Sequence, residues 1–413
     1  MDRPITTLFM LMSLDGKISP GASDDLDVDK DFPKISGLKE GLPQYYEIEQ
    51  TTDLWSFNTG RVQEKMGVNQ KPFPDKTPVS FVLLDNSHLT EHGVTYFCKK
   101  SRIFVLITSN RNHPAYNVKE NNLHIIFQEK LSLKKALQYI CEAASQKPDL
   151  IVFPELFIPG YPVGMNFGFS MGKRSDEGRK DWKRYYDASV VAGDSEFQQL
   201  AEAAKKAEAY ISLGFSERDA VSGTLYNSNV IFEPNGSYKV HRKLKPTGSE
   251  RVVWGDANKD YFPVTETPWE PIGSMICWES YMPLARVALY QKGITIYISP
   301  NTNDNPEWQA TIQHIAIEGK CFFVNADMII RRSSYPSDLC ERNIVSELPE
   351  FVCRGGSCII DPYGHYLTKP VWDEETIIYA ELDMSLPAAC KMEHDAIGHY
   401  ARPDILELKV NEK

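Results

Sequence analysis

The chain has 413 residues, enough for two hydrophobic cores, and its apolar content of 42% is ordinary for a globular protein. Its net charge of −11 argues against a nucleic-acid partner, whose phosphates would be repelled. No stretch approaches the ~18–20 consecutive apolar residues of a membrane span, and charges interrupt the first strand where a secretion signal would be apolar. We therefore expect a cytoplasmic protein with no membrane partner.

Short apolar strands come first in the chain. They are expected at residues 7–18, 55–62, 79–85, 103–108 and 124–127, and a helical run at 131–144 follows them. Strands then alternate with helices such as 196–209 and 283–291. These later strands are expected at 150–153, 210–215, 229–232, 273–276, 294–298, 322–325 and 357–361. This alternation indicates an α/β fold in which helices cover sheets.

Three side chains with complementary chemistry stand at the ends or edges of apolar segments: Glu155, Lys243 and Cys277. A thiol becomes a good nucleophile when it loses its proton, and a buried carboxylate can accept that proton. A fixed ammonium stabilises the negative charge that develops when a nitrile or acyl carbon is attacked. Each residue alone also has an ordinary structural explanation, as an inert buried thiol, a salt-bridge or capping carboxylate and a solvated lysine.

The three residues lie in longer motifs. These are Phe153-Pro154-Glu155 with Gly160-Tyr161-Pro162, then His241-Arg242-Lys243-Leu244 with Glu250-Arg251, then Cys277-Trp278-Glu279. Together they resemble the nitrilase branch of the carbon–nitrogen hydrolase superfamily. The resemblance covers residues 139–413 and implies a four-layer αββα sandwich that forms a homo-oligomer.

The resemblance also implies the role of each residue. Glu155 is expected to be the general base, Lys243 the stabilising cation and Cys277 the nucleophile, with Glu250 as a second glutamate beside the lysine. The pair Trp278-Glu279 favours the nitrile-hydrolysing branch over the amidases. We expect no cofactor, and no metal because paired thiols or imidazoles at zinc-ligand spacing are missing from the sequence.

The predicted reaction is hydrolysis of an organic nitrile to the carboxylic acid and ammonia, through a thioimidate and a thioester on the cysteine. Tyr161, Trp182 and Trp278 are candidate substrate-binding aromatics, with ordinary core packing as the alternative. An amidase of the same superfamily stays open as the second function, and a product assay separates the two. A third possibility is an NADPH-dependent reductase or an inactive fusion.

That third possibility comes from residues 1–138. The segments at 7–18, 55–62, 79–85 and 103–108 resemble the riboflavin-biosynthesis reductase domain, which has a dihydrofolate-reductase-like fold. That family closes with a strand and a paired-glycine turn for the NADPH phosphates, whereas here residues 124–127 lead directly into the helical run. The segment is therefore expected to be a partial domain without a nicotinamide site. We expect residues 124–127 to pair beside 150–153 and complete the hydrolase sheet.

Overall fold

The computed structural model describes residues 55–108, 110, 113–127, 131–336 and 338–411. The strand predicted at 7–18 lies outside these residues. The chain divides into two compact units between residues 130 and 131. Helix α5 (Leu131–Ala144) runs across the boundary that the sequence placed at 138/139, so the structural division comes a few residues earlier. Within the described ranges, no helix has the length and apolarity needed to cross a bilayer.

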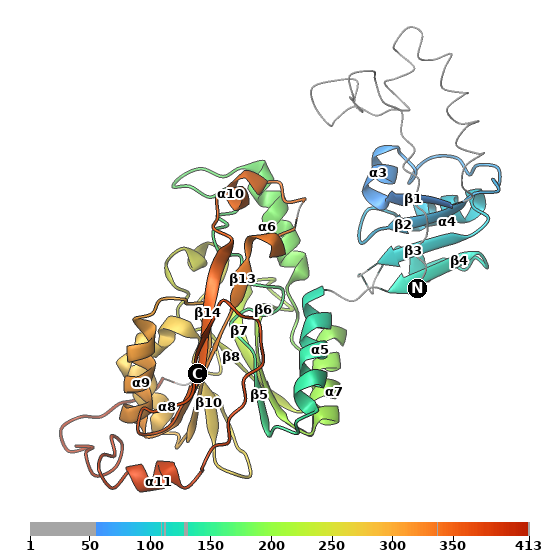
Figure 1. The fold of residues 1–413 in the computed structure, drawn as a ribbon. Helices are drawn as coiled ribbons and strands as arrows, with labels where there is room; N and C mark the ends of the chain where they lie inside the picture. The colour runs from blue at the N-terminus through green and yellow to red at the C-terminus, as the bar shows by residue number, and fades with distance from the viewer. Residues whose placement is uncertain (1–54, 109, 111–112, 128–130, 337, 412–413) are drawn as a thin grey trace. The chain divides into compact units, whose positions relative to one another are not determined.

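The first unit is built on a parallel sheet with strand order β1-β2-β3-β4 (Figure 1). Its elements are β1 (Trp55–Thr59), α3 (Gly60–Lys65), β2 (Ser80–Leu84), α4 (Glu91–Lys100), β3 (Phe104–Thr108), the 3₁₀ turn η2 (Pro114–Asn117) and β4 (Leu123–Phe127). Phe97 of α4 packs with Leu83 and Phe104 in a buried apolar cluster. This unit is α/β, as expected; its likeness to the reductase fold stays a prediction.

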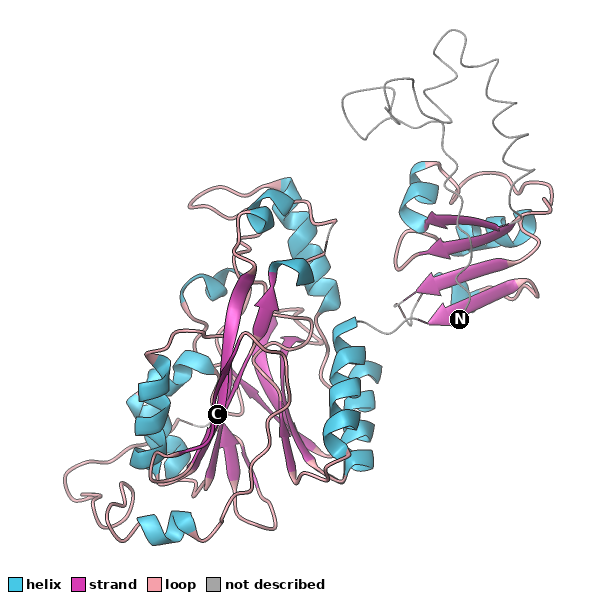
Figure 2. Cartoon of the chain, viewed as in Figure 1, coloured by secondary structure: helices cyan, strands magenta, loops and turns pink. Residues whose placement is uncertain are grey.

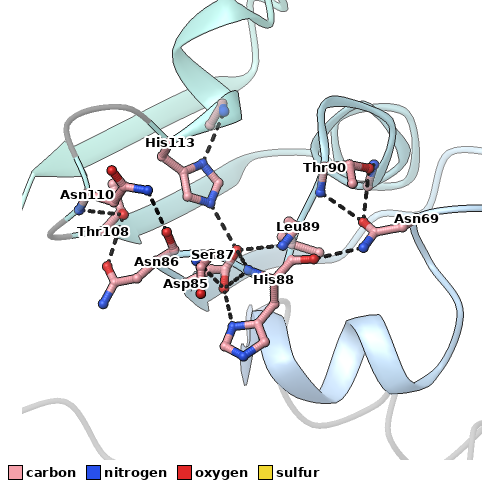
Figure 3. Close-up of polar contacts among 12 residues, drawn as sticks. Asn69, Asp85, Asn86, Ser87, His88, Leu89, Thr90, Thr108, Asn110 and His113 are labelled. Atoms are coloured by element: carbon pink, nitrogen blue, oxygen red, sulfur yellow. Dashed lines mark hydrogen bonds and ion pairs between the residues drawn. The ribbon is translucent and has the colours of Figure 1, made fainter. Parts of the chain in front are cut away.

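A buried carboxylate organises the loop that follows β2. Asp85 accepts hydrogen bonds from the Leu89 backbone N–H at 2.8 Å, from His113 Nε2 at 2.9 Å and from His88 Nδ1 at 2.9 Å (Figure 3). Burial alone would raise the pKa of Asp85, but these bonds outweigh burial and hold the pKa well below its ordinary value. A Cβ on Gly60 would lie 2.3 Å from the Asp85 carboxyl carbon, so only glycine fits there. Both oxygens of Asp85 thus accept hydrogen bonds within the first unit, which indicates a structural role for this carboxylate.

The prediction that residues 124–127 pair beside 150–153 is wrong. All five residues of β4 pair with β3, from Phe104 opposite Leu123 to Thr108 opposite Phe127. His124 and Ile126 are exposed on β4. Leu123 and Ile125, which alternate with these exposed residues, are partly buried and pack against the apolar cluster of the first unit. The alternation of this strand therefore suits the first unit.

The second unit contains two β-sheets. One has the order β5-β6-β7-β8, and the other has the order β13-β14-β12-β11-β10-β9, with β15 also paired to β14. The strands of the first sheet are β5 (Leu150–Val152), β6 (Tyr210–Arg218), β7 (Leu225–Phe232) and β8 (Tyr238–Arg242). Those of the second are β9 (Val264–Thr265), β10 (Ile272–Ser274), β11 (Ile296–Asn301), β12 (Phe322–Asp327), β13 (Ile329–Arg331), β14 (Phe351–Ile360) and β15 (Tyr366–Trp372).

Helices cover the outer face of each sheet, so the unit is the expected αββα sandwich (Figures 1 and 2). Helices α5 and α7 (Ser195–Ala207) cover the first sheet, and α8 (Pro283–Tyr290) and α9 (Trp308–Gly319) cover the second. The remaining helices are α6 (Asp176–Ala188), α10 (Arg342–Ser346) and α11 (Leu386–Cys390), and the 3₁₀ turns are η3 (Gly248–Val252), η4 (Cys277–Tyr281) and η5 (Arg332–Ser334). Apolar clusters fill each interface, and Ile231, Ile298 and Phe322 lie in the one between the sheets. This packing holds the strand ends in place.

Candidate active site

Three loops from different strands form the site. Glu155 follows β5, Lys243 follows the last residue of β8, and Cys277 follows β10. The first two loops leave one sheet of the sandwich and the third leaves the other. Buried residues at or near the end of each strand anchor it, so the polar residue that follows is held at the edge of its sheet. The fold thus brings together the three residues that the sequence selected.

Glu155 and Lys243 form a buried ion pair. Lys243 Nζ lies 2.8 Å from Glu155 Oε1, and both side chains are 0% exposed. The amide of Asn227 on β7 donates to the same oxygen at 2.7 Å. The other oxygen, Oε2, is buried and has no hydrogen-bond partner. Buried polar atoms normally have a hydrogen-bond partner, so this oxygen is an exception. It is free to accept a proton from a reacting group.

Glu250 holds Lys243 from the other side. Its two carboxylate oxygens lie 3.1 and 3.0 Å from Lys243 Nζ. Tyr161 donates its hydroxyl to Glu250 Oε1 at 2.6 Å, and the Thr247 backbone N–H donates to Oε2 at 2.7 Å. The ammonium group is therefore held between the carboxylates of Glu155 and Glu250; the catalytic role of Glu250 stays a prediction.

Cys277 opens the 3₁₀ turn η4 directly after the second sheet. The residue is 5% exposed, and its φ is +53°, in the left-handed region that residues with a Cβ occupy at a cost. The preceding strand is anchored because Met275 donates its backbone N–H to Ile298 on β11 at 3.0 Å. Residues with a strained backbone are often found at functional sites, where the strain fixes the direction of a side chain. A nucleophile needs such a fixed direction.

The site shifts the pKa of each of its three groups. Burial raises the pKa of the Cys277 thiol well above its ordinary value; the charge on Glu155 adds to this effect and Lys243 opposes it. Burial also raises the pKa of Glu155, because Lys243 and Asn227 offset only part of it. Burial lowers the pKa of Lys243, but attraction to Glu155, Cys277 and Glu250 outweighs it, and the net shift is upward. Lys243 therefore keeps its proton, and Glu155 is more basic than a surface glutamate.

The three candidate aromatics lie in different surroundings. Tyr161 contacts Glu250 and packs against Trp254, with ring centroids 5.8 Å apart. Trp182 on α6 belongs to the same apolar cluster and stacks on Tyr186. Trp278 is 47% exposed and packs edge-on against Tyr281. The structure thus brings Tyr161 to the charged centre and leaves the Trp278 ring half in solvent; the substrate-binding role of all three stays a prediction.

Sequence reasoning missed Asn227, and it named Glu279 only as part of the cysteine motif, without predicting its contacts. Asn227 supports Glu155, and Glu279 bonds to the loops that carry Lys243 and Cys277. Little in the sequence marked Asn227, because the strand was expected only at 229–232, whereas β7 begins at Leu225 and is buried along its whole length. Buried amides need hydrogen-bond partners. The described residues contain no group of three or more His, Cys, Asp or Glu side chains arranged to hold a metal ion.

Comparisons with known proteins agree with this geometry. Residues 125–392 match the family model of the carbon-nitrogen hydrolases. The chain is 41% identical over 282 residues to an aliphatic nitrilase of Sinorhizobium fredii, covering 68% of this chain and 91% of that protein. It is 41% identical over 286 residues to nitrilase 2 of Arabidopsis thaliana, covering 68% and 84%. Among solved structures, a carbon-nitrogen hydrolase from Helicobacter pylori superposes with a TM-score of 0.51 at 20% identity, covering 67% of this chain and 92% of that one; this likeness concerns the fold.

Proposed function

Because the chain belongs to the carbon–nitrogen hydrolase family, and its relatives include nitrilases, we propose that it hydrolyses an organic nitrile to the carboxylic acid and ammonia. The observation that carries the proposal is the buried Glu155–Lys243 pair, in which one carboxylate oxygen is left without a partner beside a buried, strained cysteine. Nitrile hydrolysis needs a base, a cation and a nucleophile close together in a site shielded from bulk solvent.

The first half of the reaction forms a covalent adduct. Glu155 accepts the Cys277 proton as the sulfur attacks the nitrile carbon, and one C≡N π bond breaks to give a thioimidate. Negative charge grows on the nitrile nitrogen, and the Lys243 ammonium stabilises it. The nitrogen takes up the proton that Glu155 accepted from the thiol, so Glu155 is a carboxylate again before the second half of the reaction. Because the thiol pKa is raised by burial, the thiolate forms during attack and is not a resting charge.

The second half releases both products. Water, deprotonated by Glu155, adds to the thioimidate carbon, and the carbon–nitrogen bond breaks to expel ammonia. A thioester remains, and a second water molecule hydrolyses it to the carboxylic acid and the free Cys277 thiol. Lys243 stabilises the negative charge of each tetrahedral intermediate, held in place by Glu250.

The second unit, which we propose to be the hydrolase domain, carries every residue named in these steps. The first unit is proposed to be non-catalytic. The homo-oligomer and the cytoplasmic location predicted from the sequence stay predictions, as does the assignment of Tyr161, Trp182 and Trp278 to the substrate pocket.

The test uses the purified full chain with a panel of aliphatic and aromatic nitriles and the matching amides. Ammonia and acid are measured for each compound, with Cys277→Ala as the control for contaminating activity. Acid and ammonia formed from at least one nitrile, in equal amounts and lost in Cys277→Ala, is the expected result. Turnover of amides with none of the nitriles would make the chain an amidase instead.

A further inference from the structure

Glu279 is a buried carboxylate that the reaction described above does not use. It stands two residues after Cys277, inside the turn η4, and is 2% exposed. A buried carboxylate is costly unless several donors satisfy it. The donors that satisfy Glu279 are therefore a guide to its role.

Those donors come from both catalytic loops. Glu279 Oε2 accepts the Ile276 backbone N–H at 2.6 Å, and Ile276 directly precedes Cys277. Oε1 accepts the Leu244 backbone N–H at 2.5 Å, and Leu244 directly follows Lys243. One carboxylate thus joins the main chain beside the nucleophile to the main chain beside the cation.

A third donor reinforces the link on the side of the first sheet. His241, near the end of β8, places Nε2 2.9 Å from Glu279 Oε2, and the histidine is 1% exposed. The loop after β8 leaves one sheet and η4 follows a strand of the other. The distance between Lys243 and Cys277 therefore depends on how the two sheets are joined at this point, and Glu279 bonds to both sides.

We infer that Glu279 is a positioning residue: its carboxylate sets the separation of the Lys243 ammonium and the Cys277 sulfur. This role differs from that of Glu250, which contacts the lysine side chain itself. The inference deepens the proposed function and rests on it for the reaction, but the reactivity of Cys277 toward an alkylating reagent reports the same geometry without any nitrile.

The matched variants are Glu279→Gln and Glu217→Gln. Glutamine replaces one acceptor oxygen by an NH₂ donor, which cannot accept a backbone N–H. Glu279→Gln therefore loses either the bond to Leu244, which links the two loops, or the bond to Ile276, which fixes the side chain within its own turn. Glu217 is also buried, and its carboxylate bonds to Arg242, the residue before Lys243, and to Ser228. Its loss removes a buried ionic contact to β8, the strand that leads to Lys243, without breaking the link between the loops.

Two readouts are taken on the full chain: kcat and KM for a nitrile, and the pH dependence of Cys277 alkylation by iodoacetamide. We expect Glu279→Gln to lower kcat at least tenfold with KM changed less than twofold, and to move the alkylation midpoint upward by about one pH unit because the ammonium no longer opposes the raised thiol pKa. In Glu217→Gln we expect kcat and KM to stay within about twofold of the parent and the alkylation midpoint to stay within a few tenths of a pH unit. This should hold even if the melting temperature of Glu217→Gln falls as much as that of Glu279→Gln.

Equal behaviour of the two variants in both readouts would overturn the inference. If Glu279→Gln does not fold, Glu279→Asp takes its place, because it keeps the charge but is one methylene too short to reach both loops; a wild-type alkylation profile in that variant would also overturn it. If the parent chain hydrolyses no nitrile, the proposed function fails, and the alkylation profiles alone still decide the role of Glu279.

Discussion

Two buried carboxylates, one in each unit, differ in how their surroundings satisfy them, and the difference bears on the role that we propose for Glu155. Asp85 follows β2 of the first unit and Glu155 follows β5 of the second, so both stand just beyond a short apolar strand. Donors satisfy both oxygens of Asp85, and its pKa is lowered. Glu155 keeps one oxygen without a partner, and its pKa is raised. A carboxylate just after a strand can therefore organise a loop or be available as a base. The number of hydrogen-bond donors around it decides between the two.

The largest effect is expected at the nucleophile. Cys277→Ala should lower nitrile hydrolysis by about 10⁴-fold or more, because no other group replaces the sulfur. The melting temperature of the variant should stay near that of the parent, since only the Sγ atom is removed. The measurement is ammonia release together with a thermal melt. Activity near that of the parent would remove Cys277 from the mechanism.

The next effect tests the base. Glu155→Gln keeps the shape of the side chain but removes its basicity, so kcat should fall by about 100-fold or more. A raised folded-state pKa means that ionised Glu155 costs stability as pH rises through that pKa. The variant should therefore hold its stability better than the parent as pH rises. If the pair with Lys243 were only structural, activity would fall less than tenfold and stability would drop instead.

The counterpart in the first unit is Asp85→Asn. The lowered pKa of Asp85 means that its ionised form adds stability above its unfolded pKa, and that this is lost as pH falls toward the folded value. At neutral pH the variant should destabilise the first unit by about 1–3 kcal/mol, because buried donors lose their acceptor. Hydrogen exchange of peptides from residues 80–127 measures this. Unchanged exchange there would mean that the carboxylate does not hold the loop.

The smallest effect is expected from removing the first unit. Since β4 pairs with β3, a chain that begins at residue 131 loses no strand from either sheet of the second unit. Its kcat/KM for a nitrile should lie within about twofold of the parent. Failure of the shortened chain to fold, or a loss above tenfold, would show that the hydrolase domain depends on the first unit.

The same contrast explains how far the sequence could predict the structure. Glu155, Lys243 and Cys277 could be proposed from the sequence because each motif is local, and the αββα layers were expected from the family resemblance. The partner of β4 was not predictable, because a short apolar strand fits any open sheet edge and its exposed His124 only has meaning once the neighbours are known. The role of Glu279 was hidden for a related reason. Its donors, Leu244 and Ile276, are backbone groups far apart in the chain, and no residue type marks them.

The central claim is that the Cys277 sulfur becomes covalently attached to the substrate. The most direct test is mass spectrometry of a reaction quenched in acid during turnover, followed by digestion. We expect the peptide containing Cys277 to gain the mass of the acyl group or of the intact nitrile, and we expect this adduct to form more slowly in Glu155→Gln, which lacks the base that accepts the thiol proton. Turnover with an unmodified Cys277 peptide, or with the adduct on another residue, would contradict the account.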